Sequence, residues 1–224
     1  MAVPFENIPE NIRVPLFYGE FRSGGTPYVN NARLLLIGQK LAAGSAVAGQ
    51  PILVQDSAVA GLFGANSMLA QMHKIARKNA PLQEIWALPL TDFVSGVAAT
   101  GTITVAGAPV TQTGVASVYI AGRRVRVGIL STDTNNSIAT NLAAAINAAA
   151  DLPVTATVAA AVVTLTARHK GTLGNFIEVD LGYLTEEGPL GKSLFTIVAM
   201  ANGAGDPDID TALDALGDDE FDWL

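Results

Sequence analysis

The sequence predicts a mixed α/β (α+β) fold in which a small domain of antiparallel strands and one helix is inserted into an α/β domain. Continuous apolar runs at 33–38 and 84–90 lie on either side of a helical repeat, which is typical of buried strands joined by a crossover. Residues 101–167 instead show short alternating strands and one amphipathic helix. The predicted parts are an extended N-terminal arm, an α/β domain and an insertion, with bounds 1–28, 29–95 together with 176–224, and 96–175.

The composition limits the chemistry that this chain of 224 residues is expected to perform. With no cysteine and two histidines, we expect no disulfide, no metal site and no cofactor. A net charge of -7 argues against nucleic-acid binding, which depends on neutralising phosphates with Lys and Arg. The arginines at 123, 124 and 126 are interpreted as the solvated face of a hairpin or as a salt-bridging contact with a neighbouring subunit.

No apolar run approaches the about 20 residues that span a bilayer, so no membrane insertion is expected. The N-terminus also lacks a basic start followed by an apolar block. We therefore expect no signal peptide and a chain that is made in a cytoplasm.

The first 28 residues combine apolar side chains with prolines at 4, 9, 15 and 27, which exclude a helix or a central strand. The residues that we assign to a subunit-linking arm are Phe5, Ile8, Ile12, Val14, Leu16, Phe17 and Tyr18. An extended apolar segment needs a partner. It either adds a strand to the sheet edge of another subunit or folds back on its own chain.

Strands at 33–38, 51–55 and 84–90 are expected to belong to one sheet, with a crossover that makes the sheet parallel. Between them, Asp56 or Ser57 is expected to cap a short helix.

A second helix begins at Asn66 or Ser67 and stops before Pro81. Its predicted apolar stripe consists of Met68, Leu69, Met72, Ile75 and Ala76. His73 falls on the polar side of this helix and is predicted to lie on the surface.

The insertion begins with a β-branched strand at 102–105, and the preceding Gly101 is expected to permit a turn. Strands at 115–120 and 123–129 are joined by Ala121-Gly122, which we interpret as a hairpin turn because Gly122 can adopt a positive φ. Because apolar and polar residues alternate along both strands, we predict a half-buried pair.

From Thr134 the apolar spacing becomes helical, and Asp133 or Thr134 is expected to cap the first turn. The predicted stripe consists of Ile138, Leu142, Ala145, Ile146 and Ala149. A strand pair at 154–158 and 162–167 follows, so one helix is expected to pack on a small antiparallel sheet.

After the insertion, His169 is predicted to lie in a turn before a strand at 177–181. No Ser, Cys or carboxylate is placed in sequence to make it a catalytic base. A further strand is expected at 194–200, and residues 221–224 resemble the first residues of another strand.

Three aspartates near the C-terminus have the spacing of a calcium loop: Asp206, Asp208 and Asp210. The segment lacks the glycine and the closing glutamate of that loop. We therefore expect Asp208 or Asp210 to cap a helix that ends at Gly217.

Several stretches, in this order, carry a resemblance to a known family: VPFENIPENIRVPLFYGEF, RLLLIGQ, VAGLFGANSMLAQMHKIARKN followed by EIWALPL, GTITVAG with IAGRRVRVGI, LTARHKGTLGN, and GAGDPDIDTALDALGDDEFD. Together they resemble the N-terminal half of Mu-like contractile phage tail sheath proteins. The resemblance implies an incomplete sheath-type α/β domain with an inserted domain and an extended arm. It also leads us to expect a fragment or a truncated product.

The resemblance further implies a structural protein without catalysis, whose subunits stack as hexameric rings around a tail tube and contract to drive the tube through the host envelope. Its implied partners are other sheath subunits, the tail tube protein, and a baseplate or tail terminator. Its implied location is the virion tail, after assembly in the bacterial host cytoplasm. An alternative is a binding module that recognises a host-surface ligand through the insertion. A third hypothesis, an enzyme using His169 and the loop at 203–210, lacks a catalytic constellation in the sequence.

Overall fold

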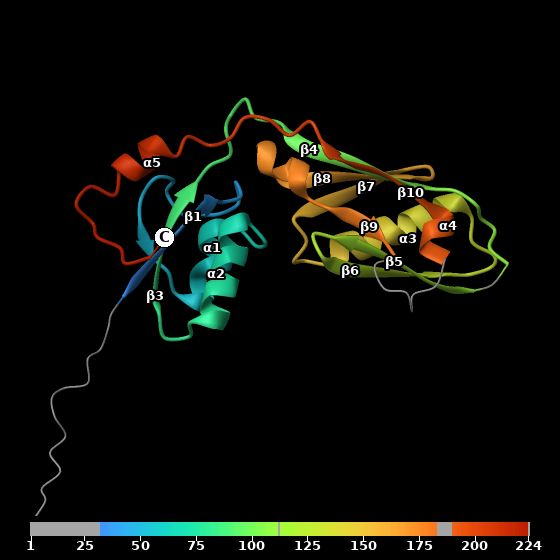
Figure 1. Cartoon of the computed structure of the whole chain (residues 1–224), viewed down its shortest axis with the longest axis horizontal. Helices are drawn as coiled ribbons and strands as arrows, with labels where there is room; N and C mark the ends of the chain where they lie inside the picture. The colour runs from blue at the N-terminus through green and yellow to red at the C-terminus, as the bar shows by residue number, and fades with distance from the viewer. Residues whose placement is uncertain (1–31, 112, 183–189, 224) are drawn as a thin grey trace, which may run out of the picture. The chain divides into compact units, whose positions relative to one another are not determined.

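The protein is described by a computed structural model over residues 32–111, 113–182 and 190–223 (Figure 1). These residues form a mixed α+β fold with three sheets, which confirms the predicted fold class. No helix in these ranges is long and apolar enough to cross a membrane.

The α/β part has one sheet with the strand order β1-β3-β2. Strand β1 pairs with β3 in parallel, as predicted. The prediction of a parallel sheet is wrong for β2, which pairs with β3 antiparallel. The elements of this part are β1 (Arg33–Gln39), β2 (Ile52–Leu53), the 3-10 helix η1 (Asp56–Ala58), α1 (Val59–Phe63), α2 (Met68–Asn79), β3 (Glu84–Leu90) and α5 (Asp210–Asp214).

Each face of this sheet has its own apolar cluster, because successive side chains of a strand point to opposite faces. Leu36 and Ile85 pack with Phe63 and Leu69 of the helices α1 and α2. The other face carries a cluster that consists of Leu35, Leu88, Leu90 and Ala212, the last from α5. Helices α2 and α5 therefore cover opposite faces of one sheet (Figure 1).

Helix α2 begins as predicted, with the Ser67 hydroxyl accepting a hydrogen bond from the amide of Ala70 at 3.1 Å. Its buried stripe differs from the prediction. Ile75 is 60% exposed, whereas His73 is only 3% exposed. The stripe runs through 69, 72, 73 and 76, which is the i, i+3, i+4, i+7 spacing of one helix face.

The predicted cap of the first short helix is wrong. The residue that precedes η1 is Gln55, and neither it nor Ala58, which precedes α1, makes a side-chain capping bond. The Asp56 carboxylate instead accepts a hydrogen bond from Arg77 Nε at 2.8 Å. The carboxylate therefore ties η1 to α2.

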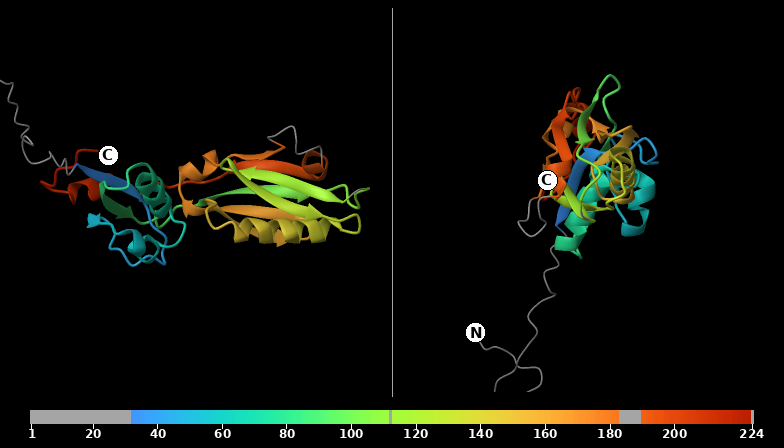
Figure 2. Two further views of the ribbon diagram at one scale, coloured as in Figure 1. Left: turned by 90° about the horizontal axis from the view of Figure 1, so that it is seen from below. Right: turned by 90° about the vertical axis from the view of Figure 1, so that its right-hand side faces the viewer.

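The inserted part contains two sheets, with the orders β10-β4-β8-β7 and β6-β5-β9. Its elements are β4 (Ala98–Val105), β5 (Gly114–Ile120), β6 (Arg123–Ile129), α3 (Asn135–Ala148), β7 (Val154–Ala159), β8 (Val162–Lys170), the 3-10 helix η2 (Thr172–Phe176), β9 (Val179–Leu181), α4 (Leu190–Leu194) and β10 (Phe195–Ala201). One apolar core joins α3 to strands of both sheets (Figure 2). The helix thus packs on two sheets rather than on the single sheet predicted.

Helix α3 has the expected N-terminus. The Thr134 hydroxyl accepts from the amide of Ser137 at 3.2 Å, and the Ser137 hydroxyl accepts from the amide of Thr134 at 2.9 Å. This reciprocal capping box satisfies two amides that the helix itself leaves unpaired. Ile138, Leu142 and Ile146 are completely buried, as their spacing predicts.

The hairpin of β5 and β6 turns at Ala121 and Gly122, whose φ angles of 50° and 73° suit a two-residue turn. Strand β6 alternates between exposed and buried residues as predicted. Strand β5 does not, because Ser117 and Tyr119 are also buried. It is the central strand of its sheet, and α4 contacts it, so both of its faces are covered.

Strand β4 is longer than predicted and includes Gly101, which does not form a turn. A Cβ at this position would lie 2.8 Å from Met200 Sδ and 3.0 Å from the carbonyl oxygen of Val198, so a larger residue would force Met200 and β10 to shift. Strands β10 and β9, at 195–201 and 179–181, pair with β4 and β5. These pairings favour an end of the inserted part near 201, and the domain boundaries remain a prediction.

Candidate functional site

The predicted linking-arm residues Phe5, Ile8, Ile12, Val14, Leu16, Phe17 and Tyr18 all lie outside the described residues. The arm therefore stays a prediction. Within the described ranges, three places bear on function: the outer edge of β1, a polar network between β3 and β8, and a pocket beside α2.

The outer edge of β1 binds an extended segment from the C-terminal end of the described chain. Trp223 pairs with Leu34 as a parallel bridge. The amide of Leu35 donates to the carbonyl of Trp223 at 2.9 Å, and the amides of Asp222 and Trp223 donate to the carbonyl of Arg33 at 3.0 and 3.2 Å. Of the strand-like pattern predicted at 221–224, Asp222 and Trp223 form backbone hydrogen bonds with β1, and residue 224 lies outside the described residues.

The Arg33 side chain anchors this added segment. Its guanidinium lies 4.8 Å from the ring centroid of Trp86 and 4.7 Å from that of Phe221, and it donates to the carbonyl of Glu220 at 3.0 Å. The Arg33 amide donates to a carboxylate oxygen of Asp222 at 2.7 Å. Side chains therefore set the register of a segment whose backbone pairs along the strand edge.

A polar network lies where β3 leaves the α/β part and β8 ends. His169 Nδ1 is 3.0 Å from Asp92 Oδ1, and its Nε2 accepts from the amide of Met68 at 2.9 Å. The Lys170 amide donates to the other Asp92 oxygen at 3.0 Å. Gln39 Nε2 donates to Asp92 and to the carbonyl of Lys170, both at 2.9 Å.

These contacts define the state of His169. An amide can only donate, so Nε2 must accept and the ring proton resides on Nδ1, facing the Asp92 carboxylate. The lone pair that a general base would use is already bound by the first turn of α2. This arrangement connects chain segments and leaves the imidazole no free nitrogen for catalysis.

The prediction of a turn histidine without a carboxylate partner is wrong. His169 lies in strand β8, which extends to Lys170, and Asp92 contacts it from 77 residues away. The predicted following strand is also shorter, because η2 occupies 172–176 and β9 begins at Val179. No local pattern in the sequence indicates a pair this far apart.

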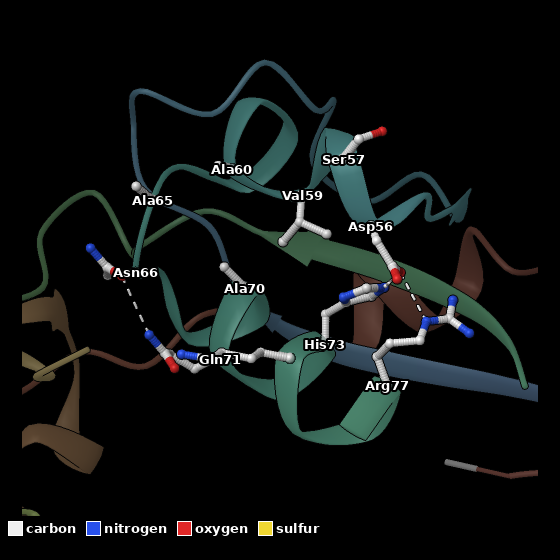
Figure 3. Close-up of a pocket in the computed structure, with 11 residues that line it drawn as sticks. Asp56, Ser57, Val59, Ala60, Ala65, Asn66, Ala70, Gln71, His73 and Arg77 are labelled. Atoms are coloured by element: carbon white, nitrogen blue, oxygen red, sulfur yellow. Dashed lines mark hydrogen bonds and ion pairs between the residues drawn. The ribbon is translucent and has the colours of Figure 1, made fainter. Parts of the chain in front are cut away.

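The prediction that His73 lies on the surface is also wrong. The imidazole lies beneath a pocket of about 380 Å³ between η1 and α2 (Figure 3). Its Nε2 is buried without a hydrogen-bond partner among the described residues and lies 3.5 Å from Asp56 Oδ1. Burial lowers the pKa of His73, the Asp56 charge partly opposes this shift, and Arg77 adds to it.

The lowered pKa of His73 predicts a loss of stability in acid. The unfolded chain, with its ordinary histidine value of 6.5, binds the proton more readily than the folded chain does. The free energy of unfolding therefore falls as the pH drops through 6.5. In His73→Gln this contribution is absent, so urea midpoints should fall less between about pH 8 and pH 5 than in the unaltered protein.

Lys74→Gln is the matched control, because it removes a neighbouring exposed charge that does not titrate in this range. Its urea midpoint should therefore fall with pH as much as that of the unaltered protein. If the urea midpoint falls equally with pH in His73→Gln and in the unaltered chain, this histidine is not the group that causes the loss of stability in acid.

The three C-terminal aspartates form two separate structural contacts. Asp206 accepts from the amide and the hydroxyl of Thr172, both at 2.7 Å, and these bonds lower its pKa. Asp208 accepts from the Thr211 hydroxyl at 2.8 Å and from the amide of Asp210 at 3.0 Å, which lowers its pKa.

Helix α5 is short and ends at 214, before Gly217. Its N-cap position is Ile209, which makes no side-chain capping bond. The predicted caps, Asp208 and Asp210, each lie one residue away from that position. Asp208 nevertheless binds donors of the first turn from just outside the helix. The described residues contain no group of three potential metal ligands.

The basic patch on β6 makes contacts within the chain. Arg123 forms an ion pair with Asp151 at 2.7 Å, and Arg124 Nε donates to the Ser117 hydroxyl at 3.1 Å. Arg123 therefore forms its ion pair within the same chain, and a salt-bridging contact of this patch with a neighbouring subunit stays a prediction.

Comparisons with known proteins give one informative relative. No family model matches the sequence. The chain is 39% identical over 229 aligned residues to the Mu-like prophage FluMu tail sheath protein of Haemophilus influenzae. The match covers 100% of this chain and 47% of that relative, so the chain spans about half the length of the protein it resembles.

Proposed function

This chain is a relative of Mu-like phage tail sheath proteins, and from that relationship we propose that it is a structural subunit of a contractile phage tail sheath. The observation that carries the proposal is identity spread over the whole chain, rather than confined to one motif. Because the match covers 47% of the relative, the activity and partners of a whole sheath protein belong to the proposal. The relationship favours this role over a host-binding module.

In this proposal, copies assemble with one another around the tail tube, and the assembled sheath contracts to drive the tube through the host envelope. The partners are other sheath subunits, the tail tube protein, and a baseplate or tail terminator. The protein is located in the virion tail after assembly in the bacterial host cytoplasm. In the same proposal, the α/β part belongs to the sheath-type domain and the inserted part is a separate domain, and the pairing of β9 and β10 with β5 and β4 supports an end near 201 in place of 175.

The edge of β1 supports assembly through strand addition. It already pairs with an extended segment through backbone hydrogen bonds and an arginine anchor. Pairing of this kind provides affinity with little dependence on side chains, which suits a lattice that rearranges without dissociating. Residues 1–28 are the segment that we assign to strand pairing between copies.

The test is the location of the chain on phage particles. Antibodies raised against the inserted part and detected by electron microscopy should label tails along their length. A stop codon in the gene should give particles whose tail tubes are bare. Label confined to the tail tip, with sheathed tails in the stop-codon mutant, would support the host-binding alternative and contradict the sheath proposal.

A further inference from the structure

Charge is unevenly distributed over the α/β part. Helix α2 carries Lys74, Arg77 and Lys78 and no carboxylate. The last segment of the chain carries eight of its 20 carboxylates and no Lys or Arg after Lys192. These carboxylates belong to Asp206, Asp208, Asp210, Asp214, Asp218, Asp219, Glu220 and Asp222.

The two charged segments cover opposite faces of the same sheet. Helix α2 packs on the face that carries Leu36 and Ile85, and α5 packs on the face that carries Leu35 and Leu88. Figure 1 shows the two helices on either side of β1 and β3. The lysines of α2 therefore lie over one face of the sheet and the carboxylates of α5 over the other, and Asp56 is a carboxylate on the α2 side, where it pairs with Arg77.

The basic face, defined here by Lys74, Ile75, Lys78 and Leu82, has groups without partners. None of the described residues forms an ion pair with either lysine. Ile75 is 60% and Leu82 100% exposed, and exposed apolar side chains beside charges are typical of contact surfaces. The pocket lined by Lys74 also lies over the buried Nε2 of His73, which has no hydrogen-bond partner among the described residues and is 3.5 Å from Asp56 Oδ1.

The acidic face, defined here by Leu213, Asp214, Asp218 and Asp219, has matching properties. The side chains of Asp214, Asp218 and Asp219 make no ion pair with any described residue, and Leu213 is 40% exposed. Carboxylates next to an apolar side chain complement lysines next to an apolar side chain.

We propose that the basic face of one copy binds the acidic face of a second copy. This inference rests on the proposed sheath function and names two of the surfaces through which subunits meet. Two different surfaces make a head-to-tail contact, so a row of copies keeps one free face at each of its two ends. Such contacts generate rings or open helical lattices rather than closed dimers.

Disulfide trapping tests this contact cleanly, because the chain has no cysteine of its own. Full chains carrying Lys78→Cys and Asp218→Cys, distinguished by a tag, are mixed and oxidised. The mixed disulfide should form about tenfold faster than either disulfide between identical variants. Its rate should fall as salt rises from about 0.05 to about 0.5 M, because salt screens the attraction.

A charge exchange then tests whether the two faces meet. Adding Lys74→Glu to the Lys78→Cys chain should slow trapping about tenfold, and adding Asp214→Lys to the Asp218→Cys chain should recover at least part of the rate. The control replaces Lys78→Cys with Arg126→Cys, another exposed cation, on β6 of the inserted part. All substituted positions are exposed, so urea midpoints should match that of the unaltered chain.

Trapping of the Lys78→Cys and Asp218→Cys pair at the rate of the Arg126→Cys control would overturn this inference. So would a charge exchange that recovers nothing. Neither result affects the antibody labelling of tails. A chain found along tails but not trapped through these faces would keep the proposed function and lose this interface.

Discussion

Removal of residues 1–28 is expected to convert a self-associating chain into a monomer at about 0.5 M salt, which screens the proposed contact between the basic and acidic faces and leaves the association through the arm to be measured. This segment carries the apolar residues of the predicted arm, and its prolines prevent it from forming a helix of its own. An extended apolar segment is stabilised by adding to a sheet edge, and β1 shows that an edge of this fold pairs with such a segment. Light scattering on the intact chain, of 23.1 kDa per copy, and on the shortened chain gives the two masses to compare.

Two substitution pairs refine this experiment. Phe17→Ser with Tyr18→Ser should reproduce the effect of the deletion, because both remove apolar surface from the arm. Glu6→Ala with Glu10→Ala changes the same segment without removing apolar surface, so it should leave the mass unchanged. A shortened chain that associates as strongly as the intact one would exclude the linking role. A monomeric intact chain would show that the arm does not join copies of this chain.

Asp92→Ala is expected to loosen the connection between β3 and β8 and to lower the free energy of unfolding by about 2–4 kcal/mol. The Asp92 carboxylate accepts hydrogen bonds from Gln39, His169 and the Lys170 amide. Gln39 is buried, and His169 is largely so. The substitution therefore leaves donors without an acceptor in a region that water reaches poorly.

Two measurements check this prediction. Urea denaturation gives the change in stability, and hydrogen exchange of the Lys170 amide reports on one bond directly, because that amide donates to Asp92. The control is Asp219→Ala, an exposed carboxylate that should change stability by no more than about 0.5 kcal/mol. Unchanged exchange of the Lys170 amide in Asp92→Ala would contradict the role assigned to this network.

Local sequence patterns determined the elements whose structure depends on near neighbours. The β5–β6 hairpin forms at Ala121-Gly122, because both residues adopt the positive φ that the turn requires. Helix α3 begins at its capping box and buries the predicted isoleucines and leucine. The two apolar strands of the α/β part pair in parallel, as their continuous apolar sequence indicates.

The tertiary structure decided which polar residues become buried and which distant segments pair. His73 is polar and breaks the apolar pattern of α2, but η1 packs over it through Asp56 and Arg77. Asp92 and His169 meet only because β3 and β8 end at the same place. Periodicity reports the apolar side of an element, whereas burial of a polar side chain depends on contacts between residues far apart in the chain.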